Sequence, residues 1–176
     1  TDAKGGVTTF AWDEPTQTMT ITDPSGVRKD QYFGNVLVAQ VDQLGKTTSY
    51  GYDRNLNRTS VRDARGVETR MEYDGRGNLT KTTRADGTFE VRQYDPVSNN
   101  LAFLRDFRGT RTWFDYDGLD RLTTTTDENA KTVVLTYGTE GVVGSVKDER
   151  DKMTWFEYDA DLNRREIRTH VGRRTT

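Results

Sequence analysis

Aromatic residues recur along this chain at an almost constant interval, and this spacing constrains the fold more than any other feature. Successive members are 20 to 22 residues apart, and Asp follows six of the eight. A fixed period of this length indicates that one supersecondary unit is stacked many times. The aromatic column consists of Trp12, Tyr32, Tyr52, Tyr73, Tyr94, Tyr116, Tyr137 and Tyr158, and the aspartates that follow it are Asp13, Asp53, Asp74, Asp95, Asp117 and Asp159.

A second column lies between the aromatic residues and has the pattern Asp-x-x-Gly. Asp accepts hydrogen bonds from its own backbone two residues on, and Gly adopts positive φ without steric cost. The pattern therefore predicts a tight turn in every period, although some copies are degenerate and Arg84 replaces Asp in one of them. The glycines of this column are Gly5, Gly26, Gly45, Gly66, Gly87 and Gly109.

The segments between each such turn and the next aromatic residue have a period of two. Thr110, Thr112, Phe114 and Tyr116 would share one side of an extended strand, and Lys152, Thr154, Phe156 and Tyr158 repeat the pattern. Aromatic and β-branched residues at alternate positions are typical of a strand. No sustained helical pattern competes with this interpretation.

A second turn follows each Tyr-Asp pair, for example at 75–78 and 118–121, and a second Thr-rich strand then begins near Leu79, Leu101, Leu122 or Val143. Two strands of about six residues and two turns of about four account for roughly 21 residues. We therefore predict an all-β fold of tandem hairpins, stacked into a continuous curved or spiralling sheet. The array is expected to occupy residues 1–176 as about eight repeats, interrupted mid-array at both ends.

The composition weighs against several other classes of protein. Hydrophobic residues make up only 32 % of the chain, so one large apolar core is not expected. Its 26 Lys and Arg balance 28 Asp and Glu, without the clustered positive patch of a nucleic-acid-binding protein. There is no Cys, and no apolar run has the length of a membrane span. We expect no nucleic acid partner and no membrane span.

No residue pattern singles out a catalytic or metal site. The only histidine, His170, falls in a degenerate turn, and repeated carboxylates are more typical of scaffolding than of an active site. Calcium-binding β-helix repeats have a nine-residue Gly-rich period, which this chain lacks. Asn57-Arg-Thr59 and Asn78-Leu-Thr80 match the N-glycosylation pattern, which short Thr-rich sequences match readily by chance. We therefore expect no enzyme activity, no metal and no cofactor, and no ligand-binding residue is predicted.

The motif Tyr-Asp-x-x-Gly-x-Leu-Thr, present as Tyr73 to Thr80 and in a variant form as Tyr116 to Thr123, resembles the YD repeat of Rhs proteins. The resemblance extends from Asp2 to Gly172, with local departures at Trp12, Phe33, Gly138 and Arg84. It implies a β-strip that spirals into a hollow shell around a C-terminal toxin domain, as in polymorphic toxins and type VI secretion effectors. The implied partners are the rest of the shell, the toxin and possible spike or adaptor proteins, and the implied location is secreted or translocated from a bacterium.

An alternative is an extracellular adhesion or carbohydrate-recognition module, teneurin-like or associated with a cell wall. Trp113 and Trp155 occupy equivalent positions, three residues before a column tyrosine, and are predicted to lie on the opposite face of the sheet. Their indole rings could form a stacking platform for sugars, although lining of a shell is the favoured interpretation. The columns of Tyr, Asp and Gly are interpreted as structural residues that define the repeat.

Overall fold

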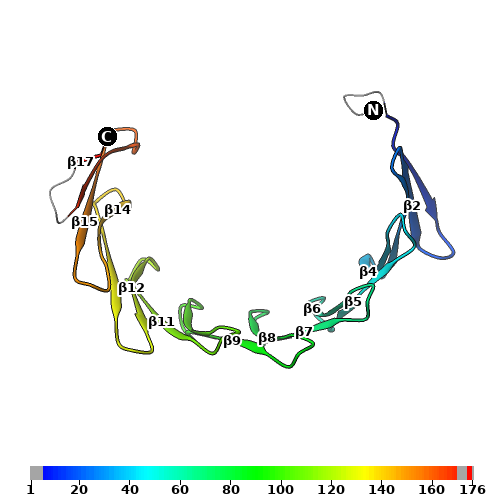
Figure 1. Ribbon diagram of the computed structural model, residues 1–176, viewed down its shortest axis with the longest axis horizontal. Coiled ribbons are helices and arrows are strands. Elements are labelled where there is room, and N and C mark those ends of the chain that lie inside the picture. Colours follow the sequence, from blue (N-terminus) through cyan, green and yellow to red (C-terminus); the bar gives the residue numbers. More distant parts are fainter. Residues whose placement is uncertain (1–5, 170–173, 176) are drawn as a thin grey trace. The chain divides into compact units, whose positions relative to one another are not determined.

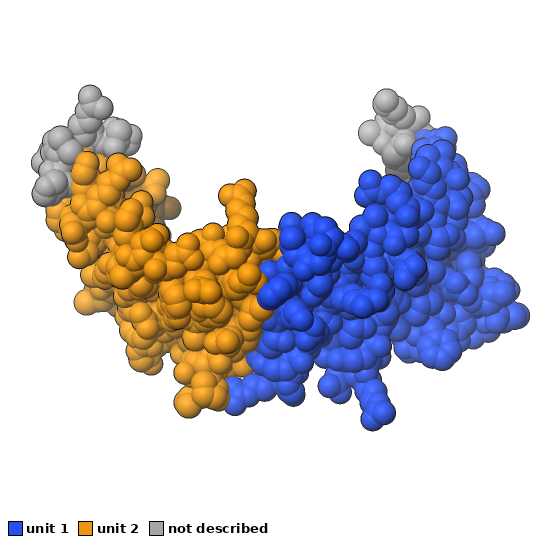
Figure 2. Space-filling model, turned by 60° about the horizontal axis from the view of Figure 1, so that its bottom comes forward, with its two compact units in different colours: residues 1–89 blue, residues 90–176 orange. Residues whose placement is uncertain are grey.

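The computed structural model describes residues 6–169 and 174–175, which form seventeen strands and no helix. Gly5, His170 and Gly172 lie outside the described residues, and so do the turn that ends at Gly5 and the turn that contains His170. The predicted all-β fold of sequential antiparallel hairpins is confirmed (Figure 1). The chain divides into two compact units, residues 1–89 and residues 90–176, which are described separately (Figure 2).

In the first unit, each strand pairs antiparallel with the next strand in the sequence. The strands are β1 (Thr9–Asp13), β2 (Thr18–Asp23), β3 (Gly26–Phe33), β4 (Val36–Val41), β5 (Thr47–Tyr52), β6 (Arg58–Arg62), β7 (Glu68–Tyr73) and β8 (Leu79–Thr83). Strand β9 (Phe89–Tyr94) begins at the last residue of this unit.

The second unit continues the same pattern of pairing in chain order. After β9, its strands are β10 (Leu101–Arg105), β11 (Arg111–Tyr116), β12 (Leu122–Asp127), β13 (Thr132–Tyr137), β14 (Val143–Lys147), β15 (Met153–Tyr158), β16 (Arg164–Thr169) and β17 (Arg174–Thr175). From Tyr52 onward, each tyrosine of the aromatic column is the last residue of the first strand of its hairpin. Trp12 and Tyr32 are each followed by one more residue of the strand.

Every hairpin from β3–β4 to β15–β16 contains a bulge beside its tyrosine. In β5–β6, Gly51 faces Ser60 and Tyr52 faces Arg58, so Thr59 is the extra residue. The hydroxyl of the equivalent Thr123 donates a hydrogen bond of 3.1 Å to the carbonyl of Asp115. An extra residue bends its strand and increases the local twist. The bulged residues are Val38, Thr59, Thr80, Ala102, Thr123, Gly144 and Arg165.

The core is thin because each unit consists of a single layer of hairpins. Among the described residues, only Ile21, Asp30 and Ser145 are buried, and none of the three is completely so. Apolar surface is covered on the tyrosine face, where the residue two before each tyrosine faces a partner on the second strand. For example, Phe114 faces Thr125, and Leu135 faces Val146. These cross-strand pairs are the main packing contacts that the sheet offers.

Candidate functional site

The described residues contain one repeated contact that joins five of the hairpins to the hairpin before them. The hydroxyl of Tyr52 donates a hydrogen bond of 2.9 Å to the carbonyl of Leu37, fifteen residues earlier. The same bond recurs with the same separation at four further tyrosines, and we call it the tyrosine stitch. Its donors and acceptors are Tyr52 with Leu37, Tyr73 with Arg58, Tyr116 with Leu101, Tyr137 with Leu122 and Tyr158 with Val143.

The stitch lies where the backbone pairing between hairpins has ended. Strands β4 and β5 pair at only three positions, of which Ala39 with Ser49 is the last. Leu37 lies beyond this point, so its carbonyl needs another donor, and the Tyr52 hydroxyl supplies it. Burial of the Tyr116 ring in the equivalent place raises the pKa of its phenol above its ordinary value.

The turns at the two ends of the hairpins share one geometry. In the turn at Asp42, the Gly45 N–H donates to the Asp42 carbonyl and the Asp42 N–H donates to the Lys46 carbonyl, each at 2.9 Å. Asp42 Oδ1 accepts the N–H groups of Leu44 and Lys46, also at 2.9 Å. This is a type I turn followed by a residue of positive φ, the usual three-residue hairpin loop.

The turn after each Tyr-Asp pair is built in the same way. Asp53 Oδ1 accepts the N–H groups of Asn55 and Asn57, and Leu56 has the positive φ of 64°. The positive-φ position is therefore not reserved for Gly. In the two types of turn its non-glycine occupants are Leu56, Asn99, Asp120, Ala130, Asp151 and Leu162.

These hydrogen bonds stabilise the charged form of the turn aspartates. The side-chain amide of Asn57 is the main cause of the lowered pKa of Asp53, and Asn78 has the same effect on the pKa of Asp74. The backbone N–H of Lys131 is the main cause of the lowered pKa of Asp127. The carboxylates are therefore fixed acceptors within turns, a structural use that needs the ionised form.

A third column, which was not predicted from the sequence, lies five residues after the tyrosine. Asn57 donates its side-chain N–H to Asp53 Oδ2 at 3.0 Å, and Asn78 donates to Asp74 Oδ2 at 2.9 Å. Arg121 takes the same place, 2.8 Å from Asp117 Oδ2, and its guanidinium also lies 4.4 Å from the centre of the Tyr137 ring. The spacing of Asn57, Asn78 and Asn163 was the signal that could have revealed this column.

The departures from the motif change the local geometry. At Phe33, which replaces Asp, the loop shortens to Gly34 and Asn35, both with positive φ, and Phe33 pairs directly with Val36. This is a two-residue type I′ turn. Gly138 keeps the backbone bonds of the longer loop without a carboxylate, and Gly26 pairs directly with Asp23 across a shorter turn.

Arg84 departs in a similar way. It keeps both backbone bonds of the turn that contains Gly87, while Asp86 accepts the Thr88 N–H instead. Gly66 and Gly109 have φ of 84° and 91° in turns of the standard form. Asp95 heads a loop that is one residue longer, and Tyr94 faces Leu101 beside the bulge. Asp159 accepts the N–H groups of Asp161 and Asn163.

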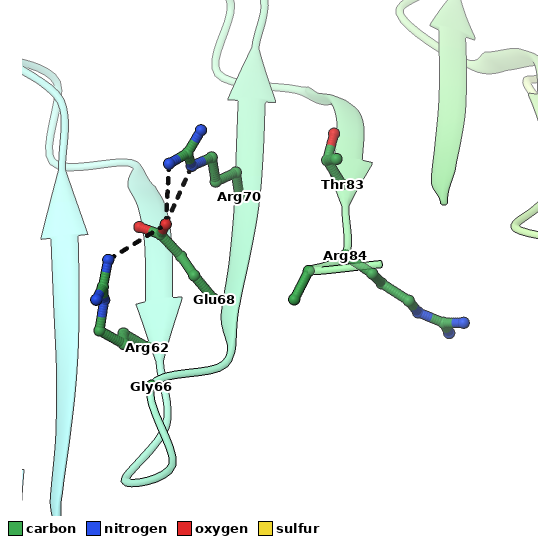
Figure 3. Close-up of a pocket in the computed structure, with 7 residues that line it drawn as sticks. Arg62, Gly66, Glu68, Arg70, Thr83 and Arg84 are labelled. Atoms are coloured by element: carbon green, nitrogen blue, oxygen red, sulfur yellow. Dashed lines mark hydrogen bonds and ion pairs between the residues drawn. The ribbon is translucent and has the colours of Figure 1, made fainter. Parts of the chain in front are cut away.

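The face opposite the tyrosines carries charged and aromatic side chains. In the first unit, Arg62 and Arg70 both reach Glu68, at 3.6 and 3.0 Å, beside a pocket of about 290 Å³ (Figure 3). Thr83 and Arg84 also line this pocket, but the Arg84 guanidinium points away from Glu68 in Figure 3. Glu68 thus neutralises part of the positive charge that the arginines bring.

Trp113 and Trp155 lie on the corresponding face of the second unit, and each is 41 % exposed. The ring of Trp113 packs against Phe103, with 5.4 Å between centroids, so one side of this indole is already covered. Trp155 pairs with Ser145 on one side and Arg168 on the other. The structure does not bring the two tryptophans together, because three strands separate them.

No group of three His, Asp or Glu side chains is arranged to hold a metal ion within the described residues. Over the same residues, we find no helix that is long and apolar enough to cross a membrane.

Comparison with known proteins supports the resemblance that the motifs suggested. Residues 52–88 match the family model described as RHS Repeat. No curated protein sequence gave a match. Among solved structures, the Photorhabdus luminescens Tc holotoxin pore carrying the mutation TccC3-D651A is similar over 97 % of this chain, with a TM-score of 0.74 and 12 % identity.

Crystal structures of TcdB2-TccC3 and TcdB2-TccC3-TEV are also similar. The first is similar over 94 % of this chain, with a TM-score of 0.70 and 15 % identity. The second is similar over 87 % of this chain, with a TM-score of 0.68 and 12 % identity. The chain spans only 12, 11 and 10 % of the length of these three solved chains, in the order given. At such low identity the likeness concerns the fold. The chain thus contains an RHS repeat segment at residues 52–88, and its hairpins share the fold of TcdB2-TccC3.

Proposed function

We propose that this chain is a wall segment of an Rhs-repeat shell that encloses a toxin domain. The observation that carries the proposal is the RHS repeat match together with a fold shared with a Tc holotoxin. The tyrosine stitches fit this role, because each one fastens a hairpin to its predecessor without the help of a second layer. A wall built in this way needs no thick core, which agrees with a chain of low hydrophobic content.

In this role the repeats are structural, and residues 1–176 act as one array. We infer that the tyrosine, aspartate and glycine columns define the repeat, with Trp12 and Tyr32 as its least regular members. The partners would be the remainder of the same shell, the enclosed toxin domain, and spike or adaptor proteins of a secretion system. The full-length protein would be secreted or translocated from a bacterial cell.

Protease protection of the full-length protein tests this function. The C-terminal domain beyond the last repeat should resist protease in the intact protein. It should become sensitive when two periods, such as residues 53–94, are deleted from the wall. A matched control is the isolated C-terminal domain, which should be digested rapidly. The proposal fails if no distinct domain follows the repeats, or if that domain is digested equally with and without the deletion.

A further inference from the structure

A pocket of about 320 Å³ lies at the tyrosine end of the first two hairpins, within the first unit. Its size is at the lower end of small-molecule sites. Arginines line the pocket of Figure 3, whereas the one charged residue that lines this pocket, among the described residues, is a glutamate. Its lining consists of Trp12, Glu14, Gln17, Met19, Tyr32 and Asn35.

The pocket exists because the first hairpin lacks the bulge of the later ones. Trp12 faces Met19 and Asp13 faces Thr18, in an unbroken register. The residue fifteen before Tyr32 is Gln17, which therefore lies in the turn, with φ of 49°. Its carbonyl accepts the backbone N–H of Tyr32 at 2.9 Å, and the Tyr32 hydroxyl is not needed there. The tyrosine that would form a stitch is released for another use.

Aromatic surface forms one side of the pocket. The rings of Trp12 and Tyr32 meet at an interplanar angle of 60°, with 5.9 Å between centroids. Met19 occupies the strand between them, on the same face of the sheet. The indole N–H of Trp12 donates to Glu14 Oε2, which fixes the ring in its orientation. Trp12 nevertheless stays 46 % exposed, so ring surface is available to a ligand.

The surroundings of the pocket are acidic. Residues 6–35 contain four carboxylates and two basic side chains, Arg28 and Lys29. The Arg28 guanidinium lies 3.2 Å from Asp30 Oδ2, so its charge is already compensated. Lys29 follows Arg28 in β3 and therefore lies on the opposite face of the strand. Because an acidic site attracts cations, Glu14 gives the pocket a preference for a positively charged ligand.

Oxygen atoms that can accept hydrogen bonds surround the aromatic rings. Two irregular turns present two side-chain amides, since Gln17 and Asn35 have φ of 49° and 68°. Within the described residues, four side-chain oxygens of the lining accept no hydrogen bond, namely those of Gln17, Asn35 and the Tyr32 hydroxyl, and Oε1 of Glu14. A ligand that donates several hydrogen bonds therefore finds an acceptor on each of four side chains.

We propose that this pocket binds the primary ammonium group of an aliphatic amine. An ammonium group has three N–H donors and no acceptor, and the pocket offers it one charged and three neutral oxygens. The cation is attracted to the faces of the Trp12 and Tyr32 rings, and its methylene stem covers their exposed apolar surface. Two sources carry this group: a free polyamine, and a lysine side chain of a protein partner. The binding does not depend on the shell role proposed above.

Three other ligand classes fit less well. A quaternary ammonium ion has the charge that suits the rings and Glu14, but it has no N–H for the amide oxygens. An alcohol has donors but no charge for Glu14 to attract. An anion is repelled by Glu14, and no Arg or Lys among the described residues lines the pocket to offset the repulsion. Of these four groups, only the primary ammonium uses the charge, the rings and the acceptors together.

Intrinsic fluorescence of the whole chain tests the proposal. In the background Trp113→Phe with Trp155→Phe, Trp12 is the only tryptophan. The probes are cadaverine, spermidine and a lysine blocked at both backbone ends, and the comparators are pentanediol and choline. We expect a saturable change in Trp12 emission with at least one amine, at a lower concentration than with either comparator. No saturation with any amine, or a comparator that binds as tightly as the best amine, would overturn the proposal.

The same titrations identify the source of the amine. Tighter binding of cadaverine or spermidine than of the blocked lysine assigns the pocket to a free polyamine, and the reverse order assigns it to a lysine side chain of a partner. Raising the salt concentration from about 50 mM to about 300 mM should weaken amine binding severalfold, because Glu14 is exposed and salt screens its charge. An affinity that does not respond to salt would contradict a charge-driven site.

Variants then connect the binding to the named side chains. By titration calorimetry, Glu14→Gln should weaken amine binding about fivefold, because it removes the charge while its amide oxygen can still accept the Trp12 indole N–H. Trp12→Ala should weaken binding about tenfold through the lost ring. The double variant of Gln17→Gly with Asn35→Gly removes both amides and suits the positive φ, so binding should weaken severalfold while the melting temperature stays near that of the parent.

Glu140→Gln is the matched control for the loss of charge. It removes one carboxylate from an exposed turn of the second unit, so it should bind amines as the parent does. Equal affinities in Glu14→Gln and Glu140→Gln would show that the attraction is not local to the pocket. That result, or unchanged affinity in Trp12→Ala, would refute the site.

Discussion

Replacing one stitch tyrosine with phenylalanine isolates the energetic contribution of the tyrosine stitch. The best position is Tyr52, because strand β5 also carries Tyr50 on the same face. Tyr52→Phe removes the hydroxyl that donates to the Leu37 carbonyl at 2.9 Å. Tyr50→Phe removes a hydroxyl that makes no hydrogen bond among the described residues. The two variants therefore lose the same atom from the same strand, and only one of them loses a stitch.

The expected size follows from the geometry of the bond. A part-buried neutral hydrogen bond contributes about 0.5–1.5 kcal/mol net, and the carbonyl that loses its donor adds to the cost. We expect Tyr52→Phe to lower the free energy of unfolding by about 1 kcal/mol. The Tyr50→Phe variant should stay within about 0.5 kcal/mol of the parent.

Urea unfolding followed by circular dichroism measures both values. With a slope of about 2 kcal/mol/M, a loss of about 1 kcal/mol lowers the midpoint by about 0.5 M, and the slope itself should not change. A triple replacement of Tyr116, Tyr137 and Tyr158 should lower the free energy of unfolding by about 3 kcal/mol, because distant sites add. Equal midpoints for Tyr52→Phe and Tyr50→Phe would refute the role given to the stitch.

Three further predictions concern the turns and the bulges. The folded-state pKa values of turn aspartates such as Asp53 are lowered, so their stabilising effect is complete above the unfolded pKa near 3.8 and is lost as the pH falls through the folded pKa values. Melting temperatures measured from pH 7 to pH 2 should therefore drop only below about pH 4. A melting temperature that does not change over this range would contradict the prediction. Ala130 and Gly109 both have positive φ, which costs Ala but not Gly. Ala130→Gly should therefore raise the free energy of unfolding by up to about 1 kcal/mol, and Gly109→Ala should lower it by about 1 kcal/mol. Urea midpoints that move in the same direction for both variants would disprove the role given to positive φ at these positions. Thr123→Val removes the hydroxyl bond of a bulge and should cost about 1 kcal/mol in the same assay, whereas a stabilised variant would show that the bond is unimportant.

The sequence predicted the hairpins and both turns because their chemistry is local. Asp and Gly at fixed offsets specify a turn within four or five residues, and the alternation around Phe114 specifies a strand. The bulges could not be predicted in this way. A bulge is a property of register between two strands, and its extra residue is Val38 in one hairpin and Arg165 in another, so no residue type marks it.

The tyrosine stitch could not be predicted from the sequence for a related reason. Its donor is visible as the tyrosine column, but its acceptor is a backbone carbonyl, which every residue has. The pocket at Trp12 was hidden as well, because it arises where the bulge and the stitch are both absent. The sequence did show Trp12 as a departure from the column, although nothing in its spacing indicated what the departure would create.

The backbone acceptor of the stitch has a consequence for how such a chain can change over generations. The accepting residue is Leu in three repeats, Arg in one and Val in another, and the bond is the same in all of them. A repeat therefore needs no particular side chain from the repeat that precedes it. Copies can be duplicated, lost or exchanged by recombination while each new junction still forms its bond.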